Sequence, residues 1–252
     1  MRLEIGYNHS FEIRKYPYPF GQLSGVTILY LSDFHYNRFG RRLAGDISDQ
    51  INRLNPNIIL LGGDYADSGR GVHHFKHMME SISHFQNVFA IPGNHDQSRI
   101  RQIRGIIESC NGVWLHHNSA SIKIGYSTIR IDSAHPIHGS RPVHSVRPAN
   151  DTRPADGAHP ADFSILCLHQ PIDVTSIAYR YNLIFAGHLH GSQAVFWRTE
   201  NGLYPGRLVY KWNRLSATFG NCRYLISKGL GDTLPLRYNC RKDAILVEIV
   251  SA

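Results

Sequence analysis

The sequence has few cysteines, and they are not arranged as a metal or disulfide framework. The four cysteines, at positions 110, 167, 222 and 240, form no C-x-x-C pair and have no regular spacing, so we expect reduced, partly buried thiols. Apolar runs of the ~18 residues that a spanning helix needs are also missing, and residues 1–20 have no apolar core of signal-peptide length. We therefore expect a soluble chain that is cytoplasmic or peripheral on the inner face of the membrane.

Acidic residues are scarce as well. Charged residues make up 18% of the 252 residues, and 27 Lys and Arg face 19 Asp and Glu, which gives a formal net charge of +8. This excess suits an anionic partner, but it does not choose between nucleic acid, an anionic membrane surface and a phosphorylated small molecule. Simple solubility explains it equally well. The 42% hydrophobic content predicts one folded domain over residues 1–252, and the oligomeric state stays open.

Short apolar runs alternate with helical spacing in the first part of the chain. Residues 43–54 and 75–85 have helical periodicity and lie between the first three apolar runs. This β-α-β-α-β order predicts parallel strands whose right-handed crossovers align their carboxyl ends. The five runs that indicate buried strands are residues 26–31, 58–61, 88–91, 164–168 and 183–186.

The pattern changes after Cys110. Residues 121–124 and 127–131, on either side of Gly125-Tyr126, indicate a β-hairpin, so the sheet becomes mixed. Residues 136–160 are rich in Pro, His and Arg and have almost no large apolar side chain, which predicts a long mobile loop. Its role stays open, and covering an active site is one alternative. Residues 244–250 predict a last strand.

Potential metal ligands follow each of the five predicted strands. A single Asp or His after a strand is more often a cap or turn residue, but the carboxyl ends of strands in an α/β sheet meet at one crevice, which favours a joint site. Asp33 and His35 lie two positions apart, so on an extended segment their side chains point the same way. The candidates are Asp33, His35, Asp64, Asn94, His95, His169, His188 and His190.

The donor types indicate which ions fit. Carboxylate, carboxamide and imidazole donors together favour Mn, Fe or Zn, with Mn preferred, whereas calcium takes oxygens alone. Cys167, two residues before His169, is interpreted as a buried core thiol. Glycines directly before Asp64, Asn94 and His188 let the backbone approach a ligand closely. The Asp64 carboxylate can bridge two ions roughly 3.5 to 4 Å apart, a spacing that matches an esterified phosphate.

Taken in chain order, the motifs that contain these candidate ligands resemble those of the calcineurin-like metallophosphoesterase family. The later stretches Ser227-x-Gly229-Leu230-Gly231 and Pro235-Leu236-Arg237-Tyr238-Asn239-Cys240 resemble its bacterial, often membrane-associated phosphodiesterase branch. Leu189 and Ser192 depart from that branch's usual Gly-His-Thr-His-Gly-Gly-Gln, but neither is a ligand. The family motifs are Asp33-x-His35, Gly63-Asp64, Gly93-Asn94-His95-Asp96, His169 and Gly187-His188-x-His190.

The resemblance implies an α/β sandwich of two mixed β-sheets flanked by α-helices, and a dinuclear metal-dependent hydrolase of phosphate esters. It implies direct attack of metal-bound hydroxide, so Ser32 is interpreted as a strand residue and not as a nucleophile. His95 is the expected catalytic residue, paired with Asp67 or Asp96. Asp33, His35, Asp64 and His190 would hold one metal, and Asp64, Asn94, His169 and His188 the other.

The substrate is less narrowly defined. The branch resemblance favours a phosphodiesterase acting on a lipid-linked or nucleotide-type substrate; a phosphomonoesterase or a non-catalytic scaffold that keeps the fold are the alternatives. Asn94, His95 and Arg38 are the candidate substrate contacts, and Arg38, Arg41 and Arg42 either attract phosphates or form a solvated helix start. A lipid contact could come from Phe11, Tyr16, Tyr18 and Phe20, although packing as an edge strand is the preferred interpretation.

Overall fold

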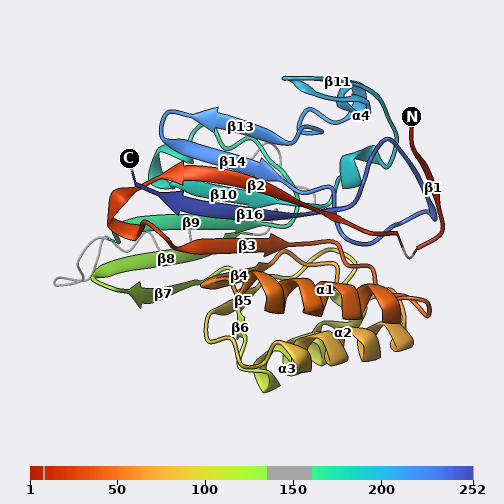
Figure 1. Ribbon diagram of the computed structural model, residues 1–252, viewed down its shortest axis with the longest axis horizontal. Helices are drawn as coiled ribbons and strands as arrows, with labels where there is room; N and C mark the ends of the chain where they lie inside the picture. The colour runs from red at the N-terminus through yellow and green to blue at the C-terminus, as the bar shows by residue number, and fades with distance from the viewer. Residues whose placement is uncertain (8, 135–160, 252) are drawn as a thin grey trace.

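The computed structural model describes residues 1–7, 9–134 and 161–251, and the loop predicted at 136–160 lies outside them. Two six-stranded sheets dominate the described part of the chain (Figure 1). The first sheet has the order β2 (Glu12–Pro19), β16 (Asp243–Val250), β3 (Thr27–Leu31), β4 (Ile58–Leu61), β5 (Val88–Ala90) and β6 (Val113–Trp114). The second has the order β13 (Ser216–Phe219), β14 (Cys222–Ile226), β10 (Leu183–Ala186), β9 (Phe163–Leu168), β8 (Ser127–Ala134) and β7 (Ser119–Ile124).

Both sheets are mixed, as the sequence and the resemblance led us to expect. In the first, β3 to β6 are parallel and β16 runs antiparallel to β3. In the second, β8, β9, β10 and β14 are parallel, whereas β7 and β13 are antiparallel edge strands. The five predicted strands and the β7–β8 hairpin are therefore confirmed. The β-α-β-α-β series of parallel strands predicted for the first part of the chain lies in the first sheet, and β9 and β10 belong to the second.

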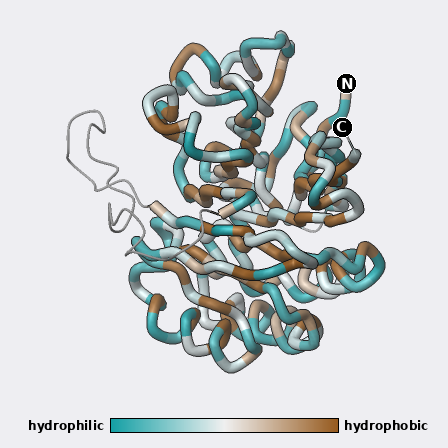
Figure 2. The backbone as a smooth tube through the Cα atoms, turned by 90° about the vertical axis from the view of Figure 1, so that its left-hand side faces the viewer, coloured by the Kyte–Doolittle hydropathy of each residue, from teal (hydrophilic) through white to brown (hydrophobic). Residues whose placement is uncertain are grey.

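Three helices cover one face of the first sheet (Figure 1): α1 (Arg41–Leu54), α2 (Gly69–Ser81) and α3 (Ile100–Ser109). The sequence predicted the first two but not α3. Alternation along β3 sorts its side chains, since Leu29 and Leu31 pack against the helices while Ile28 and Tyr30 pack between the sheets. Cys167 lies in the layer between the sheets, as expected of a core thiol. Hydrophobic stretches accordingly run through the centre of the molecule (Figure 2).

Smaller elements lie beyond the carboxyl ends of the central strands. β1 (Leu3–Ile5) pairs with β15 (Leu236–Tyr238), and we call this pair the β1–β15 ribbon. β11 (Val195–Thr199) and β12 (Gly202–Pro205) form a hairpin that leads into the one-turn helix α4 (Gly206–Val209). Figure 1 shows all of these at the upper right, at the same end of the molecule as the amino terminus.

The N-terminal aromatics behave as edge-strand residues. β2 forms an edge of the first sheet, with Tyr18 buried and Phe11, Tyr16 and Phe20 partly buried against the two hydrophobic clusters. Their side chains are therefore used in packing, in agreement with the preferred interpretation. None of the helices among the described residues has both the length and the apolar character needed to cross a bilayer.

Candidate metal centre

The predicted ligand residues come together where the carboxyl ends of strands from both sheets meet. Asp33, Asp64 and Asn94 follow β3, β4 and β5 of the first sheet, and His169 and His188 follow β9 and β10 of the second. Backbone hydrogen bonds join the loops within each sheet, since Asp33 N donates to Gly63 O and Gly187 N donates to His169 O. The backbone N–H of His188 links the two sheets by donating to Asp33 Oδ1 at 2.9 Å. The site thus lies across the edge that the two sheets share.

The first group of candidate ligands consists of Asp33, His35 and His190, with one donor atom from each within 4.8 Å of the others. The Nε2 atoms of His35 and His190 are 3.2 Å apart, and His190 Nε2 lies 3.9 Å from Asp33 Oδ1. All three side chains are buried. Two ring nitrogens and a carboxylate oxygen converging in this way suit a divalent transition-metal ion.

The second group consists of Asp64, His169 and His188, again with donor atoms within 4.8 Å of one another. His169 Nε2 lies 3.2 Å from Asp64 Oδ2 and 2.8 Å from Asn94 Oδ1, so the carboxamide of Asn94 belongs to the same group. Asn94 and His188 are only half-buried. This group therefore opens towards solvent, unlike the first.

Asp64 lies between the two groups. Its Oδ1 accepts a hydrogen bond of 2.8 Å from the backbone N–H of His95, which fixes the carboxylate. Its Oδ2 lies 3.6 Å from His35 Nε2 of the first group as well as near His169 of the second. One carboxylate oxygen thus faces both groups, which is the position that a bridging ligand requires.

The ligand backbones are not extended, and this corrects the reason given for Asp33 and His35 pointing the same way. Asp33, His35, Asp64, His188 and His190 all have positive φ, between 43° and 71°. Residues other than glycine rarely adopt this left-handed conformation, which carries a cost of order 1–3 kcal/mol each and clusters at functional sites. Tight left-handed turns, and not strand alternation, therefore aim these side chains at a common point.

Two glycines make room for the carboxylates. A Cβ atom at Gly93 would overlap Asp64 Oδ1, and one at Gly187 would overlap Asp33 Oδ2. The backbones of these loops therefore pass directly over the acidic groups, in agreement with the close approach expected from the glycines in the sequence.

The ring orientation of two histidines is fixed through Nδ1. His169 Nδ1 lies 2.9 Å from Gly62 O, and His35 Nδ1 lies 2.9 Å from Asp67 Oδ1. With Nδ1 donating to these oxygens, Nε2 of each ring faces the ligand groups, as in many metal sites. Asp67 was expected only as a partner of His95, so its contact with His35 is a role that sequence reasoning missed.

His95 lies at the open side of the site and has two acidic neighbours with different roles. Its side chain is 47% exposed, and its Nδ1 lies 4.0 Å from Asp67 Oδ1. Asp96 is buried, and its oxygens accept hydrogen bonds from the backbone N–H groups of Gly93, Asp64 and Tyr65. Of the two expected partners of His95, Asp67 is the one that faces the ring, while Asp96 ties two ligand loops together.

The electrostatics shift the pKa values of the candidate ligands in different directions. Burial opposes charge on His169, but its hydrogen bond and attraction to Asp64 outweigh this and raise the His169 pKa to about 9. Burial works against ionised Asp64 too, yet His169 and His35 hold the pKa of Asp64 well below its usual value. Burial and the neighbouring His169 lower the pKa of His188 to about 4. The centre thus has an ionised carboxylate beside a neutral His188.

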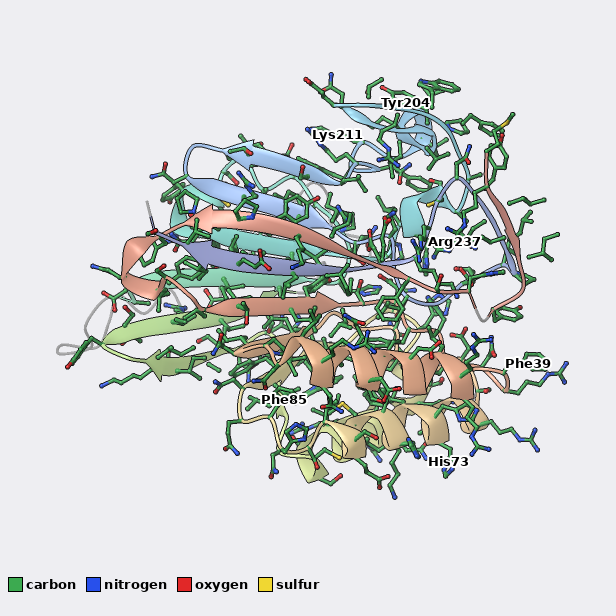
Figure 3. All side chains as sticks on the ribbon, in the orientation of Figure 1. Phe39, His73, Phe85, Tyr204, Lys211 and Arg237 are labelled. Atoms are coloured by element: carbon green, nitrogen blue, oxygen red, sulfur yellow. The ribbon has the colours of Figure 1, made fainter. Side chains whose placement is uncertain are left out.

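A glycine segment braces the first group. Leu230 N donates to Ser32 O and Gly231 N donates to Asp33 O, so residues 229–231 cross the loop that carries Asp33. The buried Arg237 of β15 (Figure 3) donates from Nη2 to Lys228 O at 3.0 Å and Gly231 O at 2.8 Å. The same Nη2 lies 3.3 Å from His190 Nδ1. The only sequence signal for this brace was the resemblance of residues 227–231 and 235–240 to a family branch.

The other expected residues lie outside this cluster. The Arg38 guanidinium carbon lies 4.6 Å from the centre of the Phe39 ring, and Arg41 and Arg42 are exposed at the start of α1. Ser32 is buried and donates a 2.6 Å hydrogen bond to Asp33 Oδ2, which fits a supporting residue.

Comparisons with known proteins agree with this geometry. The sequence profile described as calcineurin-like phosphoesterase matches residues 26–192. A Caenorhabditis elegans protein named as a metallophosphoesterase is 29% identical over 178 residues, which cover 67% of this chain and 37% of that protein. Phosphodiesterase YaeI of Escherichia coli is 26% identical over 241 residues, which cover 88% of this chain and 82% of YaeI.

A solved structure shows the same fold. A Staphylococcus aureus protein named as a 5'-nucleotidase superposes with a TM-score of 0.52 at 13% identity, over 82% of this chain and 49% of that one. At this identity the likeness concerns the fold alone. The chain thus spans less than half the length of the C. elegans relative and of this structural neighbour, but most of the length of YaeI.

Proposed function

Because this chain belongs to the calcineurin-like phosphoesterase family, and is therefore a hydrolytic enzyme of a family with a dinuclear metal centre, we propose that it is a phosphodiesterase. The observation that carries the proposal is the pair of ligand groups on either side of Asp64. An intact set of this kind argues against a scaffold that has kept only the fold.

The proposed ligand sets overlap at Asp64. Asp33, His35, Asp64 and His190 hold one divalent ion, and Asp64, Asn94, His169 and His188 hold the other. The donor chemistry fits, since each set combines oxygen and imidazole nitrogen and none of the seven residues is a thiol. We propose Mn as the ion, with Fe or Zn as alternatives.

When bound, the two ions supply Lewis acidity that polarises the phosphate and activates water. The chain's own residues do the rest. His95, half-exposed beside Asn94, gives a proton to the leaving oxygen as the bond from phosphorus to that oxygen breaks and the bond from water to phosphorus forms. Asp67, 4.0 Å from His95 Nδ1, orients the ring. Asn94 and His95 also contact the phosphate, and Arg38 contributes positive charge at the mouth of the site.

A diester with a lipid-linked or nucleotide-type leaving group is the proposed substrate. The support is the E. coli relative, which is named as a phosphodiesterase and matches most of this chain, together with the excess of basic residues. A phosphate monoester is the second candidate. We also propose that the protein works in the cytoplasm or on the inner membrane face, in peripheral contact with anionic lipid; nucleic acid is the alternative anionic partner.

An ester panel tests the proposal. The full chain, reconstituted with Mn, Fe or Zn, is offered bis(p-nitrophenyl) phosphate and p-nitrophenyl phosphate. We expect metal-dependent release of nitrophenol from the bis-ester and little from the monoester. The reverse preference favours a phosphatase, and no release with any metal and either ester contradicts enzymatic activity and favours the scaffold.

A further inference from the structure

One face of the β1–β15 ribbon is apolar and exposed. In its antiparallel register Leu3 pairs with Tyr238, Glu4 with Arg237 and Ile5 with Leu236. Cross-strand pairs share a face, so Glu4 and Arg237 point inwards, where both are buried. The outer face carries Leu3, Ile5 and Leu236, which are 59%, 71% and 49% exposed.

This apolar face continues onto neighbouring elements. The Phe196 ring of β11 lies 5.3 Å from the Tyr238 ring of β15, and the Gln193 side chain donates to Leu234 O and Leu236 O. Beyond the β11–β12 hairpin, Leu208 and Val209 of α4 are both about three-quarters exposed. Exposed apolar side chains on connected elements of this kind are typical of a contact surface. We call these residues the ribbon surface; they are Leu3, Ile5, Phe196, Leu208, Val209, Leu234 and Leu236.

The segments that carry the ribbon surface are basic. Among residues 1–7, 192–214 and 232–241, the exposed or half-buried side chains with a charge are one acid, Glu200, and six bases. Two of the bases are in ion pairs, Arg2 with the buried Glu4 and Lys211 with Asp173. No ion pair within the described residues involves the other four, which are Arg198, Arg207, Arg214 and Arg241.

Exposed apolar side chains and arginines on the same segments favour one kind of partner. An anionic bilayer takes up irregular apolar side chains without a matching groove, while basic residues near its surface contribute about 1 kcal/mol each. Long basic side chains can also lie along the interface with their charge at the headgroups. A nucleic acid would match the arginines but not the leucines and isoleucine.

The ribbon surface lies next to the metal centre. Arg237 projects from the inner face of the same ribbon and its Nη2 lies 3.3 Å from His190 Nδ1. One strand layer therefore separates the exposed face from a candidate metal ligand. We propose that the ribbon surface seats this protein on an anionic lipid bilayer, which holds the metal centre close to the lipid headgroups. The proposal assigns the membrane contact to the ribbon surface and not to the N-terminal aromatics of β2. It rests on the proposed function, because a lipid-linked substrate would give the contact its use.

Vesicle co-sedimentation of the full chain tests the proposal. The vesicles are phosphatidylcholine alone or an equal mixture of phosphatidylcholine and phosphatidylglycerol. We expect binding to the mixed vesicles that weakens as salt rises, because the basic residues are screened. A variant with Ile5→Thr and Leu236→Thr should bind about tenfold more weakly, because both changes remove apolar side-chain surface from the contact.

The matched control carries Tyr126→Thr and Val113→Thr, at exposed apolar positions on other strands and turns; it should bind as the parent does. Urea unfolding midpoints establish that both variants fold. The proposal is overturned if the parent binds neither kind of vesicle. It is also overturned if the ribbon variant and the control variant lose the same amount of vesicle binding. A parent that is a dimer in solution and a ribbon variant that is a monomer also overturns it, because a second copy then covers the surface.

Hydrolysis separates this inference from the proposed function. The ribbon variant should cleave soluble bis(p-nitrophenyl) phosphate within about twofold of the parent rate, since its changes lie outside the ligand groups and cost less than the ~1.4 kcal/mol of a tenfold effect. If no metal supports hydrolysis, the phosphodiesterase proposal fails. The co-sedimentation result then still decides, independently, whether the ribbon surface binds lipid.

Discussion

The two ligand groups differ in how they are enclosed. In the first group, Asp33, His35 and His190 are all buried, and residues 229–231 lie across them under the brace of Arg237. In the second, Asp64 and His169 are buried, but Asn94 and His188 are half-buried and the adjacent His95 is exposed. The first group is therefore the closed side of the centre, and we expect substrate to arrive at the second.

Removing the carboxylate common to both groups should have the largest effect. Asp64→Asn takes a charge from the point where the groups meet, so we expect loss of both ions and more than about 100-fold loss of turnover, beyond the 10–100-fold typical of residues that only support a ligand. Metal analysis of the purified variant and the ester assay measure this. Asp49→Asn, on the exposed side of α1, is the matched control, and retention of two ions by Asp64→Asn would contradict the bridging role.

A substitution at His95, on the open side of the centre, should leave metal binding unchanged. His95→Ala is expected to keep two ions and lower turnover about 100-fold, the usual contribution of a general acid. His77→Ala, at an exposed histidine of α2, should leave turnover unchanged. Equal turnover of His95→Ala and the parent would remove His95 from the catalytic machinery.

Asp67 links the closed group to the open side, because it contacts His35 at 2.9 Å and faces His95. Asp67→Asn should therefore weaken metal affinity by roughly 10–100-fold and slow turnover as well. Metal titration and steady-state kinetics of the same sample distinguish the two effects. Loss of turnover at saturating metal with unchanged affinity would show that Asp67 serves His95 alone.

Enclosure should also control how the ions leave. When a chelator is added to the loaded protein, we expect one ion per chain to depart before the other, because the second group is more accessible to solvent. Metal content measured against time should show two phases, with His188→Asn lacking the fast one. A single phase for both ions would mean that the difference in burial has no kinetic consequence.

The smallest expected effect is the release of protons when metal binds. The His169 pKa of about 9 exceeds its usual 6.5, so in the metal-free protein its stabilisation is complete below pH 6.5 and is lost as pH rises through about 9. Metal binding needs the Nε2 lone pair, so binding near pH 7.5 should release about one proton from His169. Calorimetry in two buffers of different ionisation enthalpy measures this. Unchanged heat between the buffers would contradict a protonated His169.

Much of the fold followed from the sequence, because short apolar runs with polar ends are a local signal. The runs at β4 and β10 matched to the residue, and the helical periods at α1 and α2 were visible in the spacing of apolar side chains. The division into two sheets was not visible in this way, since β9 looks the same whether it pairs with β5 or with β8. Only the family resemblance implied the sandwich.

The candidate site shows the same limit. All seven proposed ligands were found from their positions after strands, yet the reason given for Asp33 and His35 failed because their backbones turn into left-handed conformations. Asp67, Asp96 and Arg237 support the ligands through contacts 31 to 47 residues away in sequence, which no local pattern encodes. Long-range support of this kind became visible only in three dimensions.

Anomalous X-ray scattering from crystals of the Mn-loaded protein tests the central claim most directly. Two peaks per chain are expected, one among Asp33, His35 and His190 and one among Asn94, His169 and His188, with the Asp64 carboxylate between them. A single peak, or peaks away from these side chains, would contradict the two-metal centre.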